Sequence, residues 1–388
     1  MSITEIDKQY IANTYARFPV ELVSGKGAIL KASDGKEYID LGAGIAVNAF
    51  GVADDEWVAA VMEQLNKLTH TSNLYFTEPC ARLAQMLCER TGMKKAFFGN
   101  SGAEANECAI KVARRYAFEK YGDESHSTII TLKNSFHGRT IATLTATGQD
   151  GYHTHFGPFV EGFVYAEANN LDDVKRLAEE NNCVAIMMEL VQGEGGVCKL
   201  DEAFVSGVKA LAEEKDMLII IDEVQTGNGR TGSLYAFQQY GLNPDIVTTA
   251  KGIGGGLPIG IAMLGEKVQD VLVPGSHGTT FGGNPVCCAG ACSILSRIDD
   301  NLLSEVKAKS EYIFEELGNA QGVKSVSGLG LMIGIETEKS AKDIVNACLE
   351  KGVLVLTAKT KVRLLPPLNI GWDELKKAIA ILKETIAE

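Results

Sequence analysis

The chain has 388 residues, of which 45% are hydrophobic and 22% charged, and its formal net charge at pH 7 is −13. This length exceeds the size at which one hydrophobic core usually suffices, so two domains are expected, and the acidic charge argues against non-specific nucleic-acid binding. The first residues are polar and no apolar run could span a bilayer, which predicts a cytoplasmic protein without membrane contact.

The first expected elements form a hairpin, because apolar and polar residues alternate over Lys36–Asp40 after an Asp34-Gly35 turn. Through the middle of the chain, short apolar runs alternate with longer amphipathic segments such as residues 105–117. This pattern is typical of an α/β domain with helices on both faces of a parallel sheet. The expected strands are residues 96–98, 128–132, 184–188, 217–221, 246–249 and 261–264.

From about residue 300 the pattern becomes α+β. We expect a helix at 302–317, one glycine-punctuated strand at 328–335, then a helix, a strand and a last helix at 373–386. The sequence therefore predicts a large domain over residues 61–274. It also predicts a smaller domain built from both termini, residues 1–60 and 275–388.

Small and polar residues follow the expected strands, where ligands bind in open α/β sheets. Gly99–Asn106 open a helix and could hold a phosphate on their amide groups. The residues that follow the next strands are Phe136-His137-Gly138-Arg139, Glu189 with Gly193–Gly196, Asp222–Gln225, and Lys251. If the strands are assigned correctly, these groups meet at one edge of the sheet.

Pyridoxal phosphate (PLP) requires this set of groups: a lysine for a Schiff base, a carboxylate for the ring nitrogen, an aromatic surface and a phosphate site. A lysine after a buried strand is costly to bury as a cation, and a Schiff base removes that charge. Four ordinary alternatives stay open: Lys251 as a surface lysine, Asp222 as a helix N-cap, Phe136 as plain core and Arg139 as a surface ion-pair partner.

The motifs together resemble those of the class III (ω-amino acid) aminotransferases, from about residue 25 to 370. They are Asn100–Glu107, Phe136–Arg139, Gln192–Gly196, Asp222–Gly227, Thr249–Lys251 and His277–Pro285. The resemblance implies the fold-type-I PLP-dependent transferase fold, an α/β large domain with a mostly parallel central sheet plus a smaller α+β domain. It also implies a homodimer whose subunits share the active site. The chain departs from the family at Glu189-Leu190, where Glu-Pro is common.

The resemblance also implies residue roles. The phosphate is bound by Ser101, Gly102 and Ala103, with Thr280 reaching it from the partner subunit. The ring lies between Phe136 and Val224, with Asp222 at its nitrogen, Gln225 at its phenolic oxygen, Glu223 in the same set and Lys251 forming the Schiff base. Substrate carboxylates are bound by Arg139, with Thr279 nearby, and by Arg363. Glu194 pairs with Arg363 when one donor is bound and moves away when the other is bound.

Within this family, the motifs are most similar to enzymes that convert N2-acetyl-L-ornithine and 2-oxoglutarate to N-acetyl-L-glutamate 5-semialdehyde and L-glutamate, in arginine biosynthesis. Three alternatives stay open. The donor could be ornithine, succinylornithine, succinyl-diaminopimelate or 4-aminobutyrate. The enzyme could be a PLP-dependent mutase, racemase or decarboxylase. Or Gly227, Gly229 and Gly232 could belong to a nicotinamide oxidoreductase, although Asp222 and Glu223 before them would repel a pyrophosphate.

Cysteine and histidine residues predict no metal site. The nine cysteines include no CxxC pair, which favours reduced thiols, and Cys287, Cys288 and Cys292 lie in a small-residue segment that favours a packed helix. His153 and His155 have the spacing of a metal-binding pair, but a loop is favoured there.

Overall fold

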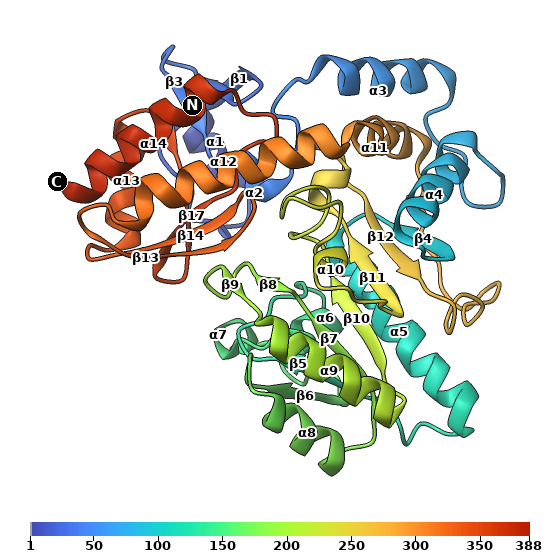
Figure 1. Ribbon diagram of the computed structural model, residues 1–388. Helices are drawn as coiled ribbons and strands as arrows, with labels where there is room; N and C mark the ends of the chain where they lie inside the picture. The colour runs from blue at the N-terminus through green and yellow to red at the C-terminus, as the bar shows by residue number, and fades with distance from the viewer. Residues whose placement is uncertain (1) are drawn as a thin grey trace.

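A computed structural model describes residues 2–388, and its centre is a seven-stranded sheet (Figure 1). The order is β4 (Lys95–Gly99), β12 (Gly260–Leu264), β11 (Ile246–Thr249), β10 (Leu218–Asp222), β7 (Cys183–Met188), β5 (Thr128–Leu132) and β6 (Phe163–Ala166). Each expected strand is present, and β6 is an addition. Only β12 runs antiparallel to its neighbours, so the predicted mostly parallel sheet is confirmed.

Helices cover both faces of this sheet because its central strands are apolar on both sides. In β10, Leu218 and Ile220 pack in one cluster with α5 (Gly102–Tyr121). The alternate residues Ile219 and Ile221 pack in another cluster with α9 (Glu202–Lys215). The period of two along the strand therefore divides its side chains between the two helical layers.

The two ends of the chain meet in a smaller sheet, β1 (Leu22–Lys26), β2 (Ile29–Ala32), β3 (Glu37–Asp40) and β15 (Val353–Leu354). The predicted hairpin is β2–β3, and β15 lies parallel to β3 with Val353 opposite Ile39. In Figure 1 these blue and red segments lie together above the central sheet. The proposed domain boundaries at residues 60 and 274 stay a prediction.

The predicted single strand at 328–335 is wrong. Residues 323–337 form a hairpin of β13 (Val323–Leu329) and β14 (Met332–Thr337), which turns at Gly330 with φ of 58°. A glycine in this left-handed region closes a turn without steric cost, so the glycine marked a reversal of direction. The other strands are β17 (Lys361–Leu364) and β16 (Leu356–Ala358), which extend this sheet, and the pair β8 (Val191–Gln192) and β9 (Cys198–Lys199).

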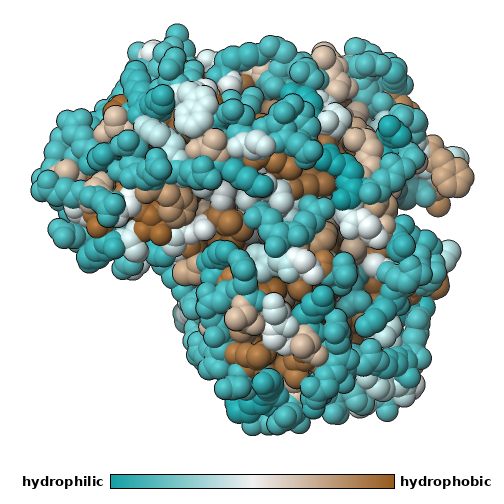
Figure 2. All heavy atoms as spheres, viewed as in Figure 1, coloured by the Kyte–Doolittle hydropathy of each residue, from teal (hydrophilic) through white to brown (hydrophobic). Residues whose placement is uncertain are grey.

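The remaining helices surround these sheets. They are α1 (Ile3–Tyr10), α2 (Ala43–Ala46), α3 (Asp55–Lys67), α4 (Glu78–Thr91), α6 (Ile141–Ala146), α7 (Asp150–His153), α8 (Leu171–Glu180), α10 (Ala236–Gln239), η1 (Lys251–Ile253), α11 (Pro285–Arg297), α12 (Asp300–Gly318), α13 (Ala341–Glu350) and α14 (Trp372–Ala387). Over residues 2–388 none is both long and apolar enough to cross a membrane. Hydrophilic residues dominate the face shown in Figure 2, in keeping with the acidic composition.

Candidate active site

A cavity of about 450 Å³ opens where the sheet strands end. Its wall includes residues at the ends of β4, β7, β10 and β11 or in the first few positions after them, and residues of the loop after β5. The structure therefore brings together most of the residues predicted from the sequence. Those lining the cavity are Ser101, Gly102, Ala103, Phe136, Arg139, Glu194, Asp222, Val224, Gln225 and Lys251.

Lys251 begins η1 at the end of β11 and has a φ of 48°, a conformation that costs energy for a residue with a Cβ. Asn228 holds the preceding turn, because its Nδ2 donates to Thr249 Oγ1 at 3.0 Å and to the Ala250 carbonyl at 3.2 Å. Burial lowers the pKa of the Lys251 amine, against the opposing effect of Glu194. Lys251 is therefore no surface lysine but a partly buried amine in the cavity wall, and its lowered pKa makes the uncharged, nucleophilic form more accessible than in a free lysine.

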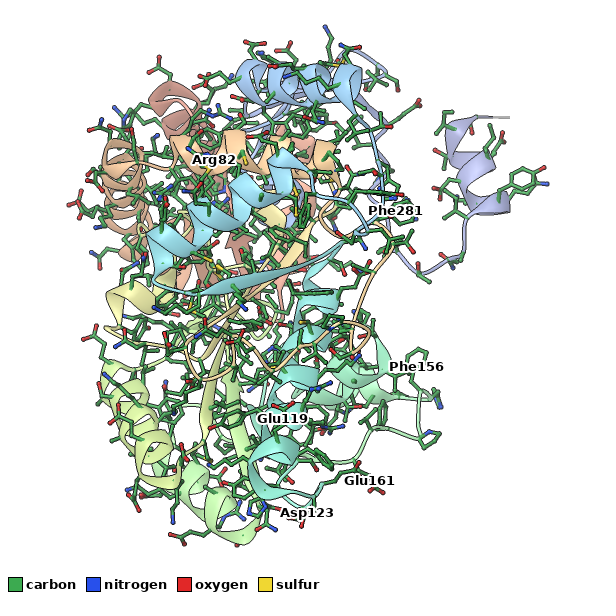
Figure 3. All side chains as sticks on the ribbon, turned by 90° about the vertical axis from the view of Figure 1, so that its right-hand side faces the viewer. Arg82, Glu119, Asp123, Phe156, Glu161 and Phe281 are labelled. Atoms are coloured by element: carbon green, nitrogen blue, oxygen red, sulfur yellow. The ribbon has the colours of Figure 1, made fainter. Side chains whose placement is uncertain are left out.

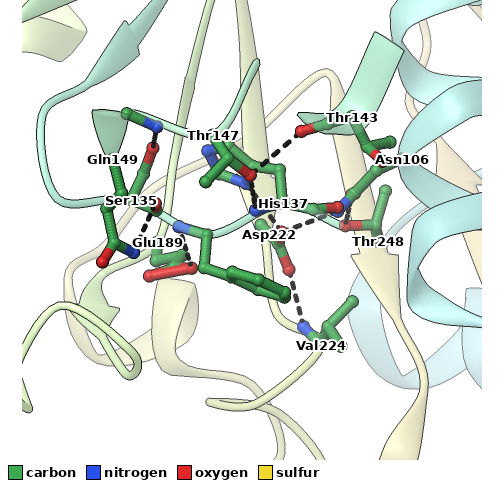
Figure 4. Close-up of polar contacts among 12 residues, drawn as sticks. Asn106, Ser135, His137, Thr143, Thr147, Gln149, Glu189, Asp222, Val224 and Thr248 are labelled. Atoms are coloured by element: carbon green, nitrogen blue, oxygen red, sulfur yellow. Dashed lines mark hydrogen bonds and ion pairs between the residues drawn. The ribbon is translucent and has the colours of Figure 1, made fainter. Parts of the chain in front are cut away.

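Asp222 ends β10, and three polar groups contact its carboxylate (Figure 4). Its Oδ2 accepts from Asn106 Nδ2 at 2.7 Å and lies 2.8 Å from His137 Nδ1, while its Oδ1 accepts from the Val224 amide at 3.0 Å. The carboxylate is 3% exposed and no helix begins there, so the N-cap alternative is wrong. These contacts fix the orientation of the Asp222 carboxylate at the end of the strand.

Asn106 and His137 were quoted in the sequence motifs without a role. Asn106 lies on α5, one turn after the glycine cradle, and its Oδ1 accepts from Thr248 Oγ1 at 2.7 Å. The amide of His137 donates to Thr147 Oγ1 at 2.9 Å, which fixes the backbone of its loop. Both residues therefore orient the Asp222 carboxylate, a function that becomes visible only when three distant segments are placed together.

The start of α5 forms an anion cradle. Ser101 caps the helix, because its Oγ accepts from the Glu104 amide at 3.2 Å and its carbonyl accepts from the Ala105 amide at 3.1 Å, so the amides of Gly102 and Ala103 remain for a ligand. A Cβ on Gly102 would lie 2.7 Å from Val224 Cγ1, and no side chain fits there. The dipole of this 20-residue helix adds positive potential at the same place.

Arg139 lies beside the cavity and stacks on aromatic rings. Its guanidinium carbon is 4.0 Å from the Tyr152 ring centroid and 5.4 Å from that of Phe136. Within residues 2–388 it forms no ion pair with a carboxylate, which argues against the surface ion-pair alternative. Phe136 itself is half-buried and forms part of the cavity wall, so it is more than plain core.

Glu194 and Arg363 form an ion pair at the edge of the cavity. Arg363 Nη1 lies 2.5 Å from Glu194 Oε1, and it also lies 3.4 Å from Gln225 Oε1. Burial alone would raise the pKa of Glu194, but the adjacent guanidinium holds it below its usual range. Arg363 is 3% exposed and comes from β17, so the smaller C-terminal sheet contributes directly to this site.

Glu223 is not among the residues that line the cavity, so its place among the cofactor-binding residues stays a prediction. Neighbouring residues at a strand end point to opposite sides, and Glu223 accepts from the Phe237 amide at 2.7 Å on the far side from Asp222. Burial raises the pKa of this carboxyl to about 7. Its contacts indicate a structural residue beneath the loop after β10.

Thr279 and Thr280 also lie outside the cavity of the single chain. The Thr279 hydroxyl accepts from Asn100 Nδ2 at 3.0 Å, which ties its loop to the start of the anion cradle and away from Arg139. Thr280 is exposed. Within one subunit, therefore, neither Thr279 nor Thr280 is among the residues that line the cavity with Arg139 and Glu194.

The alternative motifs occupy ordinary structural positions. Gly229 and Gly232 have φ of 86° and 84° in turns between β10 and α10, so no helix opens at the fingerprint as dinucleotide binding requires. Cys288 is buried within α11. His153 packs against Phe159, and its Nε2 lies 2.8 Å from the Leu144 carbonyl oxygen.

Comparison with known proteins decides the family. Residues 10–386 match the model of the family described as aminotransferase class-III. The chain belongs to the class III aminotransferases. The resemblance inferred from the motifs is thereby confirmed, as is the assignment as an enzyme, and the nicotinamide oxidoreductase is set aside.

Individual relatives cover the same length as this aminotransferase. It is 52% identical over 388 residues to the acetylornithine aminotransferase of Haemophilus ducreyi, which covers 100% of this chain and 98% of the relative. The solved N-acetylornithine aminotransferase of Stenotrophomonas maltophilia is 34% identical with a TM-score of 0.85, covering 99% and 98% of the two chains. The solved ornithine aminotransferase of Toxoplasma gondii, which has partial occupancy of PLP at its active site, is 31% identical with a TM-score of 0.93, covering 99% and 93%.

Proposed function

We propose that this aminotransferase transfers the terminal amino group of N2-acetyl-L-ornithine to 2-oxoglutarate with PLP as its cofactor. The products are N-acetyl-L-glutamate 5-semialdehyde and L-glutamate, which places the reaction in arginine biosynthesis. The observation that carries the proposal is the common cavity of Lys251, Asp222 and the amide cradle of α5. Full-length similarity to the acetylornithine aminotransferase of H. ducreyi supports the choice of substrate.

The residues around the cavity fit PLP. The cradle at Gly102 and Ala103 matches its phosphate, Phe136 and Val224 supply apolar walls, and Asp222 supplies the anion for the ring nitrogen. When bound, PLP supplies an aldehyde that condenses with amines and a ring that takes up an electron pair. Binding PLP therefore accounts for a lysine and an aspartate that lie together in one cavity wall.

The protein's own part in the reaction is proton handling and orientation. Lys251 Nζ takes the proton from the substrate carbon that bears the amine and returns it to the cofactor side. Its lowered pKa suits this exchange, because a less basic amine both takes up and releases a proton more readily than an ordinary lysine. Asp222, oriented by Asn106 and His137, would face the ring nitrogen of bound PLP and hold its proton there.

Arg139 is proposed to bind the α-carboxylate of acetylornithine and the distal carboxylate of glutamate. We expect Arg139→Lys to raise KM for both donors together by about 10- to 100-fold, because lysine cannot make two parallel bonds to a carboxylate. Steady-state kinetics with each donor measure this, with Arg176→Lys on the exposed surface of α8 as the control. An effect on one donor alone would contradict the shared site.

The two donors differ at the other end, and the Glu194–Arg363 pair is proposed to adapt to that difference. With acetylornithine bound, Glu194 stays paired with Arg363, so no bare cation faces a neutral chain. With glutamate bound, Glu194 moves away and Arg363 takes the α-carboxylate. The Glu194 side chain is partly exposed whereas that of Arg363 is buried, so Glu194 is the member of the pair that can move.

We expect Glu194→Gln to favour glutamate over acetylornithine, with a change of about 10-fold or more in the ratio of kcat/KM values, since a charge-assisted bond to Arg363 is lost. Stopped-flow rates of the two half-reactions measure the ratio. Equal slowing of both half-reactions would show that the pair is a static structural contact.

A homodimer with shared active sites is also part of the proposal. Figure 3 shows α1 standing away from the body of the molecule, and its Ile3, Ile6 and Tyr10 are exposed. Phe76 and Phe281 are exposed as well, and Phe281 directly follows Thr280. If a second copy of the chain covered these apolar residues, Thr280 of one subunit could reach the PLP phosphate bound by the other subunit. Analytical ultracentrifugation should show a dimer, and Phe281→Asp should raise the dissociation constant of that dimer. An enzyme that is active as a monomer would refute the shared site.

The donor is tested by a coupled assay of the purified protein with 2-oxoglutarate and a panel of amines: acetylornithine, ornithine, succinylornithine, succinyl-diaminopimelate and 4-aminobutyrate. Acetylornithine should give the highest kcat/KM. A higher value for ornithine would assign the enzyme to that sibling activity. Turnover without a stoichiometric keto acid would indicate a mutase, racemase or decarboxylase. The cytoplasmic location expected from the sequence stays a prediction.

A further inference from the structure

Glu189 is a buried acid that the reaction described above does not use. It directly follows β7, is 8% exposed and lines the cavity. Its Oε1 accepts from the Phe136 amide at 3.1 Å. Its Oε2 is buried and, over residues 2–388, has no hydrogen-bond partner. A carboxylate in this position would leave half of its charge unsatisfied, which is costly in a dry site.

A second acid lies close to it. One oxygen of Glu189, one oxygen of Asp222 and one ring nitrogen of His137 all lie within 4.8 Å of one another. Figure 4 shows Glu189 and Asp222 in the same cluster of side chains. Two carboxyl groups this close, both shielded from water, do not readily ionise together, so one of them keeps a proton.

The surrounding charges decide which acid keeps the proton. Asp222, at the end of β10, has three donors, and Glu194, after β8, has Arg363 from β17. Lys251 in η1 faces all three acids, but burial lowers its own pKa. Glu189 has no ion-pair partner among the described residues. Burial and the charge of Asp222 raise the pKa of Glu189 well above its usual range.

We propose that Glu189 acts as a neutral carboxylic acid that positions the cofactor site. Its carbonyl oxygen, Oε1, accepts the Phe136 amide and fixes the aromatic wall of the cavity. Its proton, on Oε2, keeps a second negative charge away from Asp222, which can then remain the anion that faces the ring nitrogen. The inference rests on the proposed function, because it concerns how the same cavity binds PLP.

Glutamine is the matched probe for a neutral acid, since it has nearly the same volume, the same carbonyl acceptor and a donor in place of the hydroxyl, with no charge at any pH. We expect Glu189→Gln to bind PLP within threefold of the wild type when the apoprotein is titrated with the cofactor. Glu189→Leu, which cannot accept the Phe136 amide, should bind PLP at least tenfold more weakly. Glu213→Gln, exposed on α9, is the control for loss of a distant acid.

Two outcomes of this titration would overturn the proposal. If Glu189→Gln loses as much affinity as Glu189→Leu, an ionised carboxylate is required. If Glu189→Leu binds PLP as well as the wild type, Glu189 does not position the site.

A second measurement needs neither cofactor nor substrate. Because the pKa of Glu189 is raised on folding, its protonated form stabilises the apoprotein at low pH, and this contribution is lost as the pH rises towards that folded-state pKa. The denaturation midpoint of Glu189→Gln, measured relative to that of the wild type, should therefore rise as the pH is raised from 5 to 9. A constant difference over this range would mean that Glu189 is ionised throughout, and the proposal would fail. Since the apoprotein alone is measured, this result is independent of whether the enzyme proves to transaminate acetylornithine.

Discussion

Replacing Lys251 with alanine is expected to reduce transamination by at least about 10⁴-fold, because one side chain supplies both the covalent attachment and the proton transfer. The same change should remove the bond to the cofactor that borohydride traps. Mass spectrometry of peptides from the reduced wild-type protein should find the cofactor on Lys251. Other lysines lack its combination of burial and proximity to Asp222.

Two variants sharpen this experiment. Lys251→Arg preserves a long basic side chain but provides no amine for the bond, so it should be as inactive as the alanine variant. Lys215→Ala, at the exposed end of α9, should leave both the activity and the trapped peptide unchanged. Finding the reduced cofactor on a different lysine would end the assignment of Lys251.

Asp222→Asn is expected to retain PLP but to lose activity by on the order of 10³-fold, because a neutral amide cannot hold the proton on the ring nitrogen. The cradle at Gly102 and Ala103 is untouched, so cofactor content should stay near that of the wild type. The absorbance of bound PLP and the rates of both half-reactions measure the two effects separately. Near-normal turnover would refute the electrostatic role of Asp222, and loss of the cofactor would show that it acts mainly in binding.

Much of the fold could be predicted because the central strands are short, apolar and β-branched. Strands β5 and β11 lie at the predicted residues, β7 begins one residue earlier than predicted, and β10 is shifted by one residue. The direction of β12 could not be predicted, because an apolar strand buried on both faces has the same composition whether it runs parallel or antiparallel. Strand β6 is a four-residue edge strand that is only partly buried, so its signal was weak.

The candidate site could be predicted where one residue follows one strand, and not where residues far apart meet. Lys251 and Asp222 carry that local signal. The Asn106–Asp222 bond joins residues 116 positions apart, and His137 is 85 positions from Asp222, so no spacing in the sequence points to either pair. Glu223 follows Asp222 directly, and the alternation of side chains along a strand places its carboxyl group on the opposite side from that of Asp222.

The pairing of β3 with β15 determines when parts of this enzyme can be completed during its synthesis. All seven strands of the central sheet have left the ribosome well before Val353, and segments generally fold in the order in which they emerge. Strand β3 can pair with β15 only after the last tenth of the chain has been synthesised. The same holds for the Leu41 carbonyl, which accepts from the Leu365 amide at 2.7 Å. The same late segment carries Arg363. In a nascent chain, Lys251 and the anion cradle can therefore come together before Arg363 has been synthesised, so the small sheet and the Glu194–Arg363 ion pair form last.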